Sequence, residues 1–364
     1  MSGGSQAPGS GGTPPRGRLE LGLEEWMCAH VDGFRAPLTL DRFKGGQSNP
    51  TFLITDAAGR RYVLRKKPDG ELLPSAHAVD REFRVISALH GTDVPVPRAH
   101  GYCADAGVIG TPFYVMDFVD GRILWDPALP GFSNEERRAV YGDMNRVVAA
   151  LHRIDHRAVG LDDYGRAGDF FDRQIGRWTR QYQAAAEEDP IPEMERLIEW
   201  LPAHMPRDAA WRGETRIFHG DLRIDNMIFH ATEPRVVAVL DWELSTLGHP
   251  LADLAYHALP WRLTASQFRG MAGIDHAALA IPDEAAYLAT YCARVGRAPV
   301  DPAHWEFCVA YSMFRLAAIL HGISKRARDG TAASAQAIET GARARPIAEA
   351  AWRQIEAHFP RGDR

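Results

Sequence analysis

Two short segments in the second half of the chain carry a spaced set of oxygen-bearing side chains. In residues 219–226 (HGDLRIDN), Asp221 and Asn226 lie five residues apart, and Asp241 follows an apolar stretch further on. Carboxylate and amide oxygens are ligands that Mg²⁺ prefers. Phosphoryl transfer from a nucleotide uses one carboxylate to orient a hydroxyl and further oxygen ligands to hold the metal. The chain is therefore constrained to a fold in which the two segments meet.

A simple turn is the alternative interpretation of residues 219–226, because Asp and Asn are common turn formers. Apolar residues 217–218 and 227–229 flank the polar run, which places it between two buried segments. Ionised carboxylates near a core are costly unless they are paired or bound to metal. A hairpin leading to Asp241 would bring the three side chains to one edge. We interpret Asp221 as the catalytic residue, and Asn226 and Asp241 as the magnesium ligands.

The chain changes character after its first third. Residues 1–18 are rich in Gly, Ser and Pro and predict a disordered tail. Residues 19–118 predict a strand-rich lobe that binds nucleotide, with a hairpin formed by 51–55 and 61–65. Residues 119–364 predict a larger helical lobe for catalysis and substrate binding, so the fold class is α+β with two lobes. Apolar spacing and capping signals predict helices at residues 79–89, 133–151, 169–187, 190–201, 283–295, 303–326 and 334–357.

A cation and a glutamate in the first lobe suit the anchoring of nucleotide phosphates. Arg65 ends the second strand of the hairpin, and Glu82 lies on the following predicted helix. A strand-borne cation fixed by a helix glutamate is the usual phosphate anchor in such a lobe. The neighbouring Lys66 and Lys67 remain alternatives for the cation, and Asp80 competes with Glu82.

A glycine-containing loop and an interlobe connection complete the predicted nucleotide site. Residues 44–49 (KGGQSN) precede the hairpin, and small residues there allow backbone N–H groups to close over phosphates. The segment lacks the Gly-Lys-Ser/Thr ending of a Walker A motif. The connection at residues 116–119 offers backbone groups to adenine. The residues expected at the nucleotide are thus Gly45, Gly46, Ser48, Asn49, Met116 and Phe118, besides Arg65 and Glu82.

Composition excludes several other classes of function. The net charge of -5 argues against a nucleic-acid partner. Four scattered cysteines suit free thiols in a reducing cytoplasm rather than a zinc site or a disulfide framework. No uninterrupted apolar run reaches the ~18 residues of a membrane span. Zinc-protease and hydrolase motifs are also missing from the sequence.

The segments that surround Asp221 and Asp241 resemble the aminoglycoside phosphotransferase and choline kinase family. Residues 46–50 (GQSNP), 62–68 (YVLRKKP) and 94–97 (VPVP) look like its branch in which the kinase-like domain is fused to, or encoded near, acyl-CoA dehydrogenases. The resemblance covers about residues 20–355. It implies a bilobal protein-kinase-like fold with ATP and Mg²⁺ as cofactors.

The same resemblance assigns roles to individual residues. Asp221 would be the catalytic base, Asn226 and Asp241 would hold the metal, and the Arg65/Glu82 pair would replace the family's phosphate-anchoring ion pair. His249 stands where an Asp is more usual, which puts a minor loop contact in doubt. Asp253, in an apolar helix start, is expected to brace the catalytic loop through hydrogen bonds, although a helix N-terminal acid is an alternative.

The resemblance leaves the acceptor open. Members phosphorylate aminoglycosides, choline, homoserine-like metabolites and, in the dehydrogenase-associated branch, hydroxyacyl-CoA. From Met271 onward, acidic and basic residues are nearly balanced, and residues 325–328 form a basic cluster. This charge distribution disfavours a polycationic acceptor. The alternative is that the cluster is only a solvated helix face. We expect transfer of the γ-phosphate to a small-molecule hydroxyl, with a hydroxyacyl-CoA as candidate. One alternative is an idle nucleotide-binding module that regulates an acyl-CoA dehydrogenase partner; an Arg at position 65, where protein kinases have a Lys, favours it. The other alternative is an aminoglycoside-modifying kinase.

Overall fold

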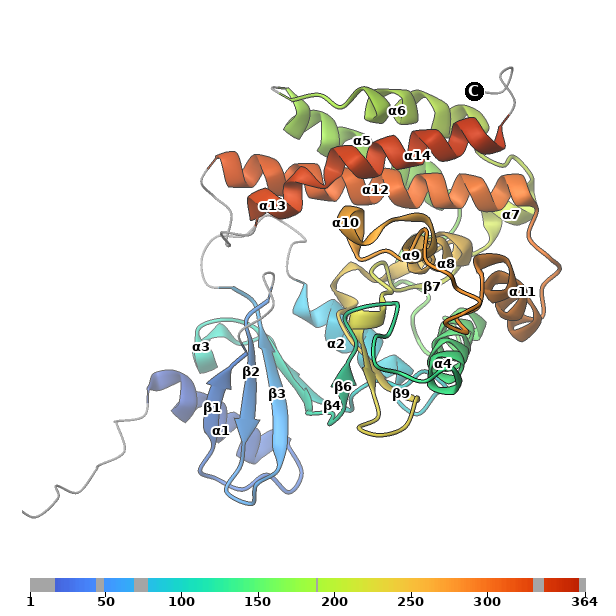
Figure 1. The fold of residues 1–364 in the computed structure, drawn as a ribbon. Helices are drawn as coiled ribbons and strands as arrows, with labels where there is room; N and C mark the ends of the chain where they lie inside the picture. Colours follow the sequence, from blue (N-terminus) through green and yellow to red (C-terminus); the bar gives the residue numbers. More distant parts are fainter. Residues whose placement is uncertain (1–16, 44–48, 69–77, 188, 330–336, 360–364) are drawn as a thin grey trace, which may run out of the picture. The chain divides into compact units, whose positions relative to one another are not determined.

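The computed structural model describes residues 17–43, 49–68, 78–187, 189–329 and 337–359. The chain forms two compact units (Figure 1). The first runs to Asp80 and includes His100–Phe118, and the second comprises Arg81–Ala99 and the chain from Val119 onward. Most of the predicted tail lies outside the described residues.

The first unit is built around a five-stranded sheet with strand order β1-β2-β3-β5-β4. The predicted hairpin of residues 51–55 and 61–65 is confirmed, because Thr51 pairs with Arg65 and Thr55 with Arg61. Side chains alternate between the two faces of a strand, and the face that carries Leu64 packs against the first helix. The elements of this unit are α1 (Arg18–His30), β1 (Thr39–Arg42), β2 (Thr51–Thr55), β3 (Arg61–Lys66), β4 (Ala99–Cys103), α3 (Ala106–Ile109) and β5 (Phe113–Asp117).

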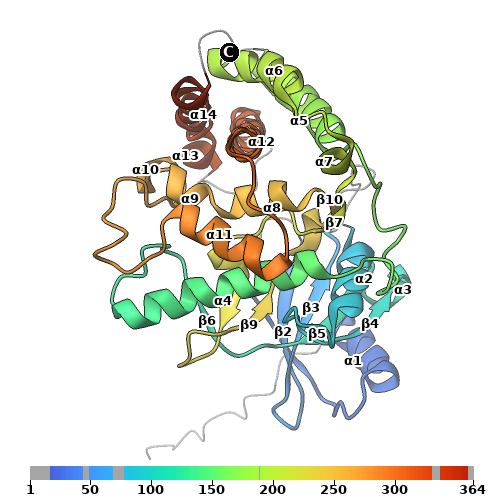
Figure 2. The same cartoon turned by 90° about the vertical axis from the view of Figure 1, so that its right-hand side faces the viewer.

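The second unit is mainly helical (Figure 2). Its long helices surround α12, which packs against α5, α8, α13 and α14. The helices are α2 (Val79–Leu89, whose first two residues belong to the first unit), α4 (Asn134–Arg153), α5 (Phe170–Ala186), α6 (Pro192–His204), α7 (Ala209–Gly213), α8 (Pro250–His257), α9 (Leu259–Arg262), α10 (Ala265–Phe268), α11 (Glu284–Val295), α12 (Pro302–Arg328), α13 (Ala337–Ala342) and α14 (Ala344–His358).

Two of these helices illustrate how the sequence sets local structure. The Ser133 hydroxyl accepts from the Glu136 N–H while the Glu136 carboxylate accepts from the Ser133 N–H, so the predicted capping box at the start of α4 is confirmed. Helix α12 is long and apolar enough to cross a membrane, but 83% of its most apolar stretch is buried in the unit. A core helix passes the same test of length and composition.

Two small antiparallel sheets position the loop between β7 and β8. One pairs β7 (Arg216–Phe218) with β10 (Thr246–Gly248), and the other joins β6 (Arg122–Ile123), β8 (Met227–Phe229) and β9 (Val236–Val239). Short 3₁₀ turns at Ile224–Asn226 and Trp242–Leu244 lie in the two predicted site segments. The sheets therefore bring these segments, which are separated in the sequence, to one place.

Candidate active site

The loop that follows β7 turns sharply at Gly220. This residue has a φ of 87°, and a Cβ placed on it would lie 2.8 Å from the Leu244 carbonyl oxygen. A residue with a side chain would therefore meet both backbone strain and a clash at this position. Glycine lets the chain turn close to the second segment and point Asp221 into the site.

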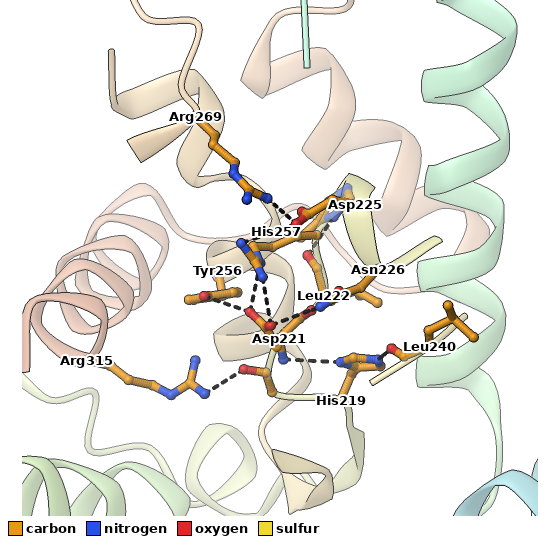
Figure 3. A network of polar contacts seen from close by, with 12 residues as sticks. His219, Asp221, Leu222, Asp225, Asn226, Leu240, Tyr256, His257, Arg269 and Arg315 are labelled. Atoms are coloured by element: carbon orange, nitrogen blue, oxygen red, sulfur yellow. Dashed lines mark hydrogen bonds and ion pairs between the residues drawn. The ribbon is translucent and has the colours of Figure 1, made fainter. Parts of the chain in front are cut away.

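Asp221 lies at the centre of a polar network (Figure 3). Its Oδ1 accepts from the Tyr256 hydroxyl at 2.8 Å. Its Oδ2 accepts from the Asn226 side-chain amide at 2.9 Å and from a terminal nitrogen of Arg223 at 3.1 Å. The Arg223 Nε lies 2.9 Å from Oδ1 as an ion pair, without the alignment of a hydrogen bond. Because each carboxylate oxygen can accept two hydrogen bonds, Oδ1 is the oxygen with capacity for one more.

The network also decides the charge of Asp221. Burial alone would raise its pKa, but the Arg223 guanidinium and the Tyr256 hydrogen bond outweigh this effect and hold the pKa below its ordinary value. Burial raises the pKa of Tyr256 strongly, with the neighbouring Asp221 charge acting in the same direction. At neutral pH the site thus contains an ionised carboxylate and a neutral phenol, which donates to it.

Asp253 holds the backbone of the loop, as predicted. Its carboxylate is fully buried and accepts from the His219 N–H at 2.7 Å and the Gly220 N–H at 3.0 Å. His152 lies 3.3 Å away and contacts the Tyr291 hydroxyl through its other ring nitrogen. Burial would raise the pKa of Asp253, but the hydrogen bond and charge of His152 lower it overall. Asp253 therefore braces the loop that carries Asp221. The alternative, that it serves only as an acidic residue near the N-terminus of α8, is the weaker interpretation.

His219 connects the two site segments. Its Nδ1 accepts from the Asp221 N–H at 3.1 Å, and its Nε2 lies 2.9 Å from the Leu240 carbonyl oxygen (Figure 3). An acceptor on one ring nitrogen and a donor on the other match the neutral imidazole with its proton on Nε2. The ring therefore fixes the loop that carries Asp221 beside Leu240, the residue that precedes Asp241.

Asn226 and Asp241 lie next to each other across the β8–β9 hairpin. Met227 pairs with Val239, and the Leu240 N–H donates to the Asn226 carbonyl oxygen at 2.8 Å. Since the Asn226 side-chain nitrogen donates to Asp221, its side-chain oxygen is the atom suited to a metal. Asp241 adopts a left-handed conformation with a φ of 66°, which is uncommon for a residue other than glycine. One amide oxygen and one carboxylate fit Mg²⁺, which commonly takes few protein ligands together with phosphates and water.

Several residues of the network were not predicted from the sequence. Arg223 pairs with Asp221 and lies 3.5 Å from Asp225, which also forms an ion pair with Arg269. Arg315, buried in α12, donates to the Gly220 carbonyl oxygen at 2.5 Å. The position of Arg223 two residues after Asp221 was a signal that could have been used. Arg269 and Arg315 carry no comparable signal, because only folding brings them to the loop.

Two of the nucleotide residues predicted in the first unit, Arg65 and Met116, share one face of its sheet. The register pairs Val63 with Met116 and Arg65 with Tyr114. Arg65 and Met116 therefore lie on the face opposite the one that packs on α1, whereas Lys66 lies on the α1 face with Leu64. This arrangement favours Arg65 over Lys66 as the phosphate anchor, although the role remains a prediction.

The other predicted nucleotide residues are placed only in part. Gly45, Gly46 and Ser48 lie outside the described residues, while Asn49 is buried at the start of the hairpin. The Phe118 ring stacks on Phe43 and lies 4.4 Å from the Arg61 guanidinium. Glu82 is buried in α2 and belongs to the second unit, so its pairing with Arg65 also remains a prediction.

Comparison with known proteins gives consistent matches. The model of the phosphotransferase enzyme family matches residues 39–302. Acyl-CoA dehydrogenase family member 10 of Mus musculus is 47% identical over 340 residues, which are 93% of this chain and 31% of that protein. The chain thus spans about a third of that relative's length.

Solved structures of phosphotransferases are also similar to this chain. A Ralstonia eutropha protein assigned provisionally as an aminoglycoside phosphotransferase is 53% identical, with a TM-score of 0.84 over 93% of this chain and 98% of that one. The GDP complex of aminoglycoside 2'-phosphotransferase-IIIa has a TM-score of 0.59 at 14% identity, over 94% of this chain and 100% of that one. At that identity the second likeness concerns the fold alone, which is the predicted kinase-like α+β fold.

Proposed function

Because the chain belongs to the phosphotransferase enzyme family, we propose that it transfers the γ-phosphate of ATP to a hydroxyl of a small molecule. The observation that carries this proposal is the adjacency of Asp221, Asn226 and Asp241. Asn226 donates to Asp221 at 2.9 Å, and its backbone pairs with the residue before Asp241. One base and two metal ligands at a single loop edge suit phosphoryl transfer.

Asp221 orients the attacking hydroxyl in this proposal. Its low pKa keeps it ionised, and Oδ1 accepts the hydroxyl hydrogen beside the Tyr256 donor. The proton passes to the Asp221 carboxylate as the acceptor oxygen bonds to phosphorus and the bond to ADP breaks. Positioning and charge neutralisation contribute most of the rate in such reactions.

Asn226 and Asp241 would hold Mg²⁺, which would neutralise the charge on the nucleotide phosphates when bound. Arg65 would anchor those phosphates from the first unit. Its place on the same sheet face as Met116 supports this role. The identity of the nucleotide as ATP and of the metal as Mg²⁺ belongs to the proposal.

Among acceptors, we favour a hydroxyacyl-CoA. The chain matches a relative that is named as an acyl-CoA dehydrogenase, of which it covers 31%. A dehydrogenase acting on the same acyl thioesters is the corresponding partner. The arginines near the catalytic loop support an acceptor that is not a polycation.

The test is magnesium-dependent release of ADP from ATP with hydroxyacyl-CoAs, choline, homoserine and aminoglycosides as acceptors. Asp221→Asn should lower turnover by about 10²-fold or more while the Kd for ATP changes by less than about threefold. Asp329→Asn, an exposed change on the surface of the second unit, is the matched control. Loss of ATP binding in Asp221→Asn would contradict the role of Asp221 as a base.

The second candidate is a catalytically idle nucleotide-binding module that regulates an acyl-CoA dehydrogenase. An Arg at position 65, in place of the kinase Lys, favours it. Tight binding to such a dehydrogenase together with ATP binding and no ADP release from any acceptor would support this candidate over the enzyme.

A further inference from the structure

A small cavity adjoins the catalytic loop in the second unit. It has a volume of about 30 Å³, which is room for about two water molecules. Its walls are largely apolar, and their aromatic side chains include Trp125, Tyr256, Trp261 and Phe268. Arg223, Asp225 and Arg269 provide its charged groups.

We propose that this cavity is the inner end of the acceptor pocket and that Arg269 is the movable latch at its mouth. The pocket would admit an acceptor with an apolar chain but reject one that carries a positive charge. The inference rests on the proposed function, because it defines which acceptors reach Asp221. It also identifies Arg269 as the residue that selects by charge.

Two side chains of the cavity wall connect it to Asp221, which does not itself line the cavity. Tyr256 and Arg223 both line the cavity, and both contact Asp221. Oδ1, the oxygen with remaining capacity to accept, faces Tyr256 (Figure 3). A hydroxyl at the inner end of this cavity would therefore lie beside the side chain that contacts this oxygen.

The charges in the pocket disfavour a cation. Among the described residues that line the cavity, Asp225 is the one carboxylate. Its side chain is 6% exposed, and it forms ion pairs with Arg223 and Arg269. A cationic acceptor would have to compete with both guanidinium groups for that carboxylate. An apolar group meets aromatic walls instead, and burying it there is favourable.

The mouth carries the features of a latch. Trp125 is 60% exposed, and the Arg269 guanidinium lies 5.1 Å from the centre of its ring. The Arg269 side chain is 40% exposed, and its backbone has a φ of 42°. Asp225 is buried, but it keeps Arg223 at 3.5 Å as a second partner, so movement of Arg269 would not leave the buried carboxylate without a cation. A large exposed ring beside an apolar cavity gives an entering acceptor further surface to cover.

The experiment uses three acceptors with the same carbon chain: ω-hydroxyhexanoate, hexanediol and aminohexanol. Binding to the full chain is measured by calorimetry without nucleotide, and kcat/KM is measured with ATP and Mg²⁺. The proteins are the wild type, Arg269→Ala, and Arg353→Ala as a control that removes an arginine 61% exposed on α14. Phe268→Ala tests the aromatic wall.

We expect aminohexanol to bind the wild type at least tenfold more weakly than the other two compounds. Arg269→Ala should reduce this difference to less than threefold, and Phe268→Ala should weaken all three, while Arg353→Ala changes neither property. Equal binding of all three compounds, an equal loss for all three in Arg269→Ala, or no binding of any would overturn the pocket assignment. ADP release with another acceptor would then still support the proposed function, whereas binding without any phosphorylation would count against that function alone.

Discussion

Replacing Asp253 by Asn tests how the fold holds the catalytic loop. The Asp253 carboxylate is fully buried and accepts from two consecutive backbone amides, those of His219 and Gly220. Asparagine has nearly the same shape but only one acceptor oxygen. Its NH₂ group would face one of the two backbone N–H groups, donor to donor.

The expected loss can be worked out from these contacts. A hydrogen bond to a charged group contributes about 1.5–3 kcal/mol, and a buried donor left without a partner costs about 1–3 kcal/mol. Asparagine retains one neutral bond and avoids the cost of burying a charge, which offsets part of the loss. We expect the free energy of unfolding to fall by about 3 kcal/mol, which is a factor of about 10² in the unfolding equilibrium.

Urea denaturation at neutral pH measures this change, and steady-state kinetics measures its consequence for the site. We expect kcat to fall by at least tenfold, because the loop that carries Asp221 loses its anchor, while the KM for ATP changes by less than threefold. Asp329→Asn serves as the control, since its exposed partner is Lys325 on the same helix. A stability loss below about 1 kcal/mol together with an unchanged kcat would refute the reasoning.

Three further changes probe other parts of the molecule. Arg65→Ala should weaken ATP binding at least tenfold and Lys66→Ala should weaken it less, because the two side chains lie on opposite faces of the sheet; the reverse order in a nucleotide titration would contradict the assignment. Gly220→Ala should lower the free energy of unfolding by about 2 kcal/mol or more, measured by urea denaturation, because of its positive φ and the clash with the Leu244 carbonyl. Burial, with the Arg297 charge acting in the same direction, lowers the pKa of His249 from an ordinary 6.5 to about 3. Between these pH values the unfolded state binds a proton that the native state does not, so the free energy of unfolding should fall as the pH drops below 6.5. In denaturation between pH 6 and 4, His249→Asn should reduce the slope of the free energy of unfolding against pH by about 1.4 kcal/mol per pH unit. An unchanged slope would show that His249 is not neutral in the native state.

Local patterns predicted most of the elements. The predicted helix of residues 283–295 is α11, Glu284–Val295, and its start follows from the Asp283 side chain, which caps the Ala286 N–H. The predicted helix of 334–357 begins outside the described residues, and from Ala337 onward it is instead two helices, α13 and α14, on either side of Arg343. Helix α1 was missed because the first lobe was interpreted as strand-rich, and β4 was missed because its sequence, AHGYC, has no alternating pattern.

The sequence by itself indicated the kind of chemistry that we propose for the site. Asp221, Asn226 and Asp241 could be chosen as candidates because the spacing of such residues and their flanking strands are local properties. Asp253 could also be assigned to bracing the loop, since a carboxylate in an apolar helix requires partners.

Only the tertiary structure decided which side chains surround Asp221 and what charge they give it. Tyr256 and Arg315 come from α8 and α12, and Arg269 follows α10, so their contacts with the loop connect distant parts of the chain. The spacing of apolar residues in the sequence does not predict such contacts, because they depend on how helices pack against one another rather than on how each helix forms. The local sequence specifies the candidate reactive groups, whereas packing sets their pKa values, their partners and the cavity that we propose as part of the acceptor pocket.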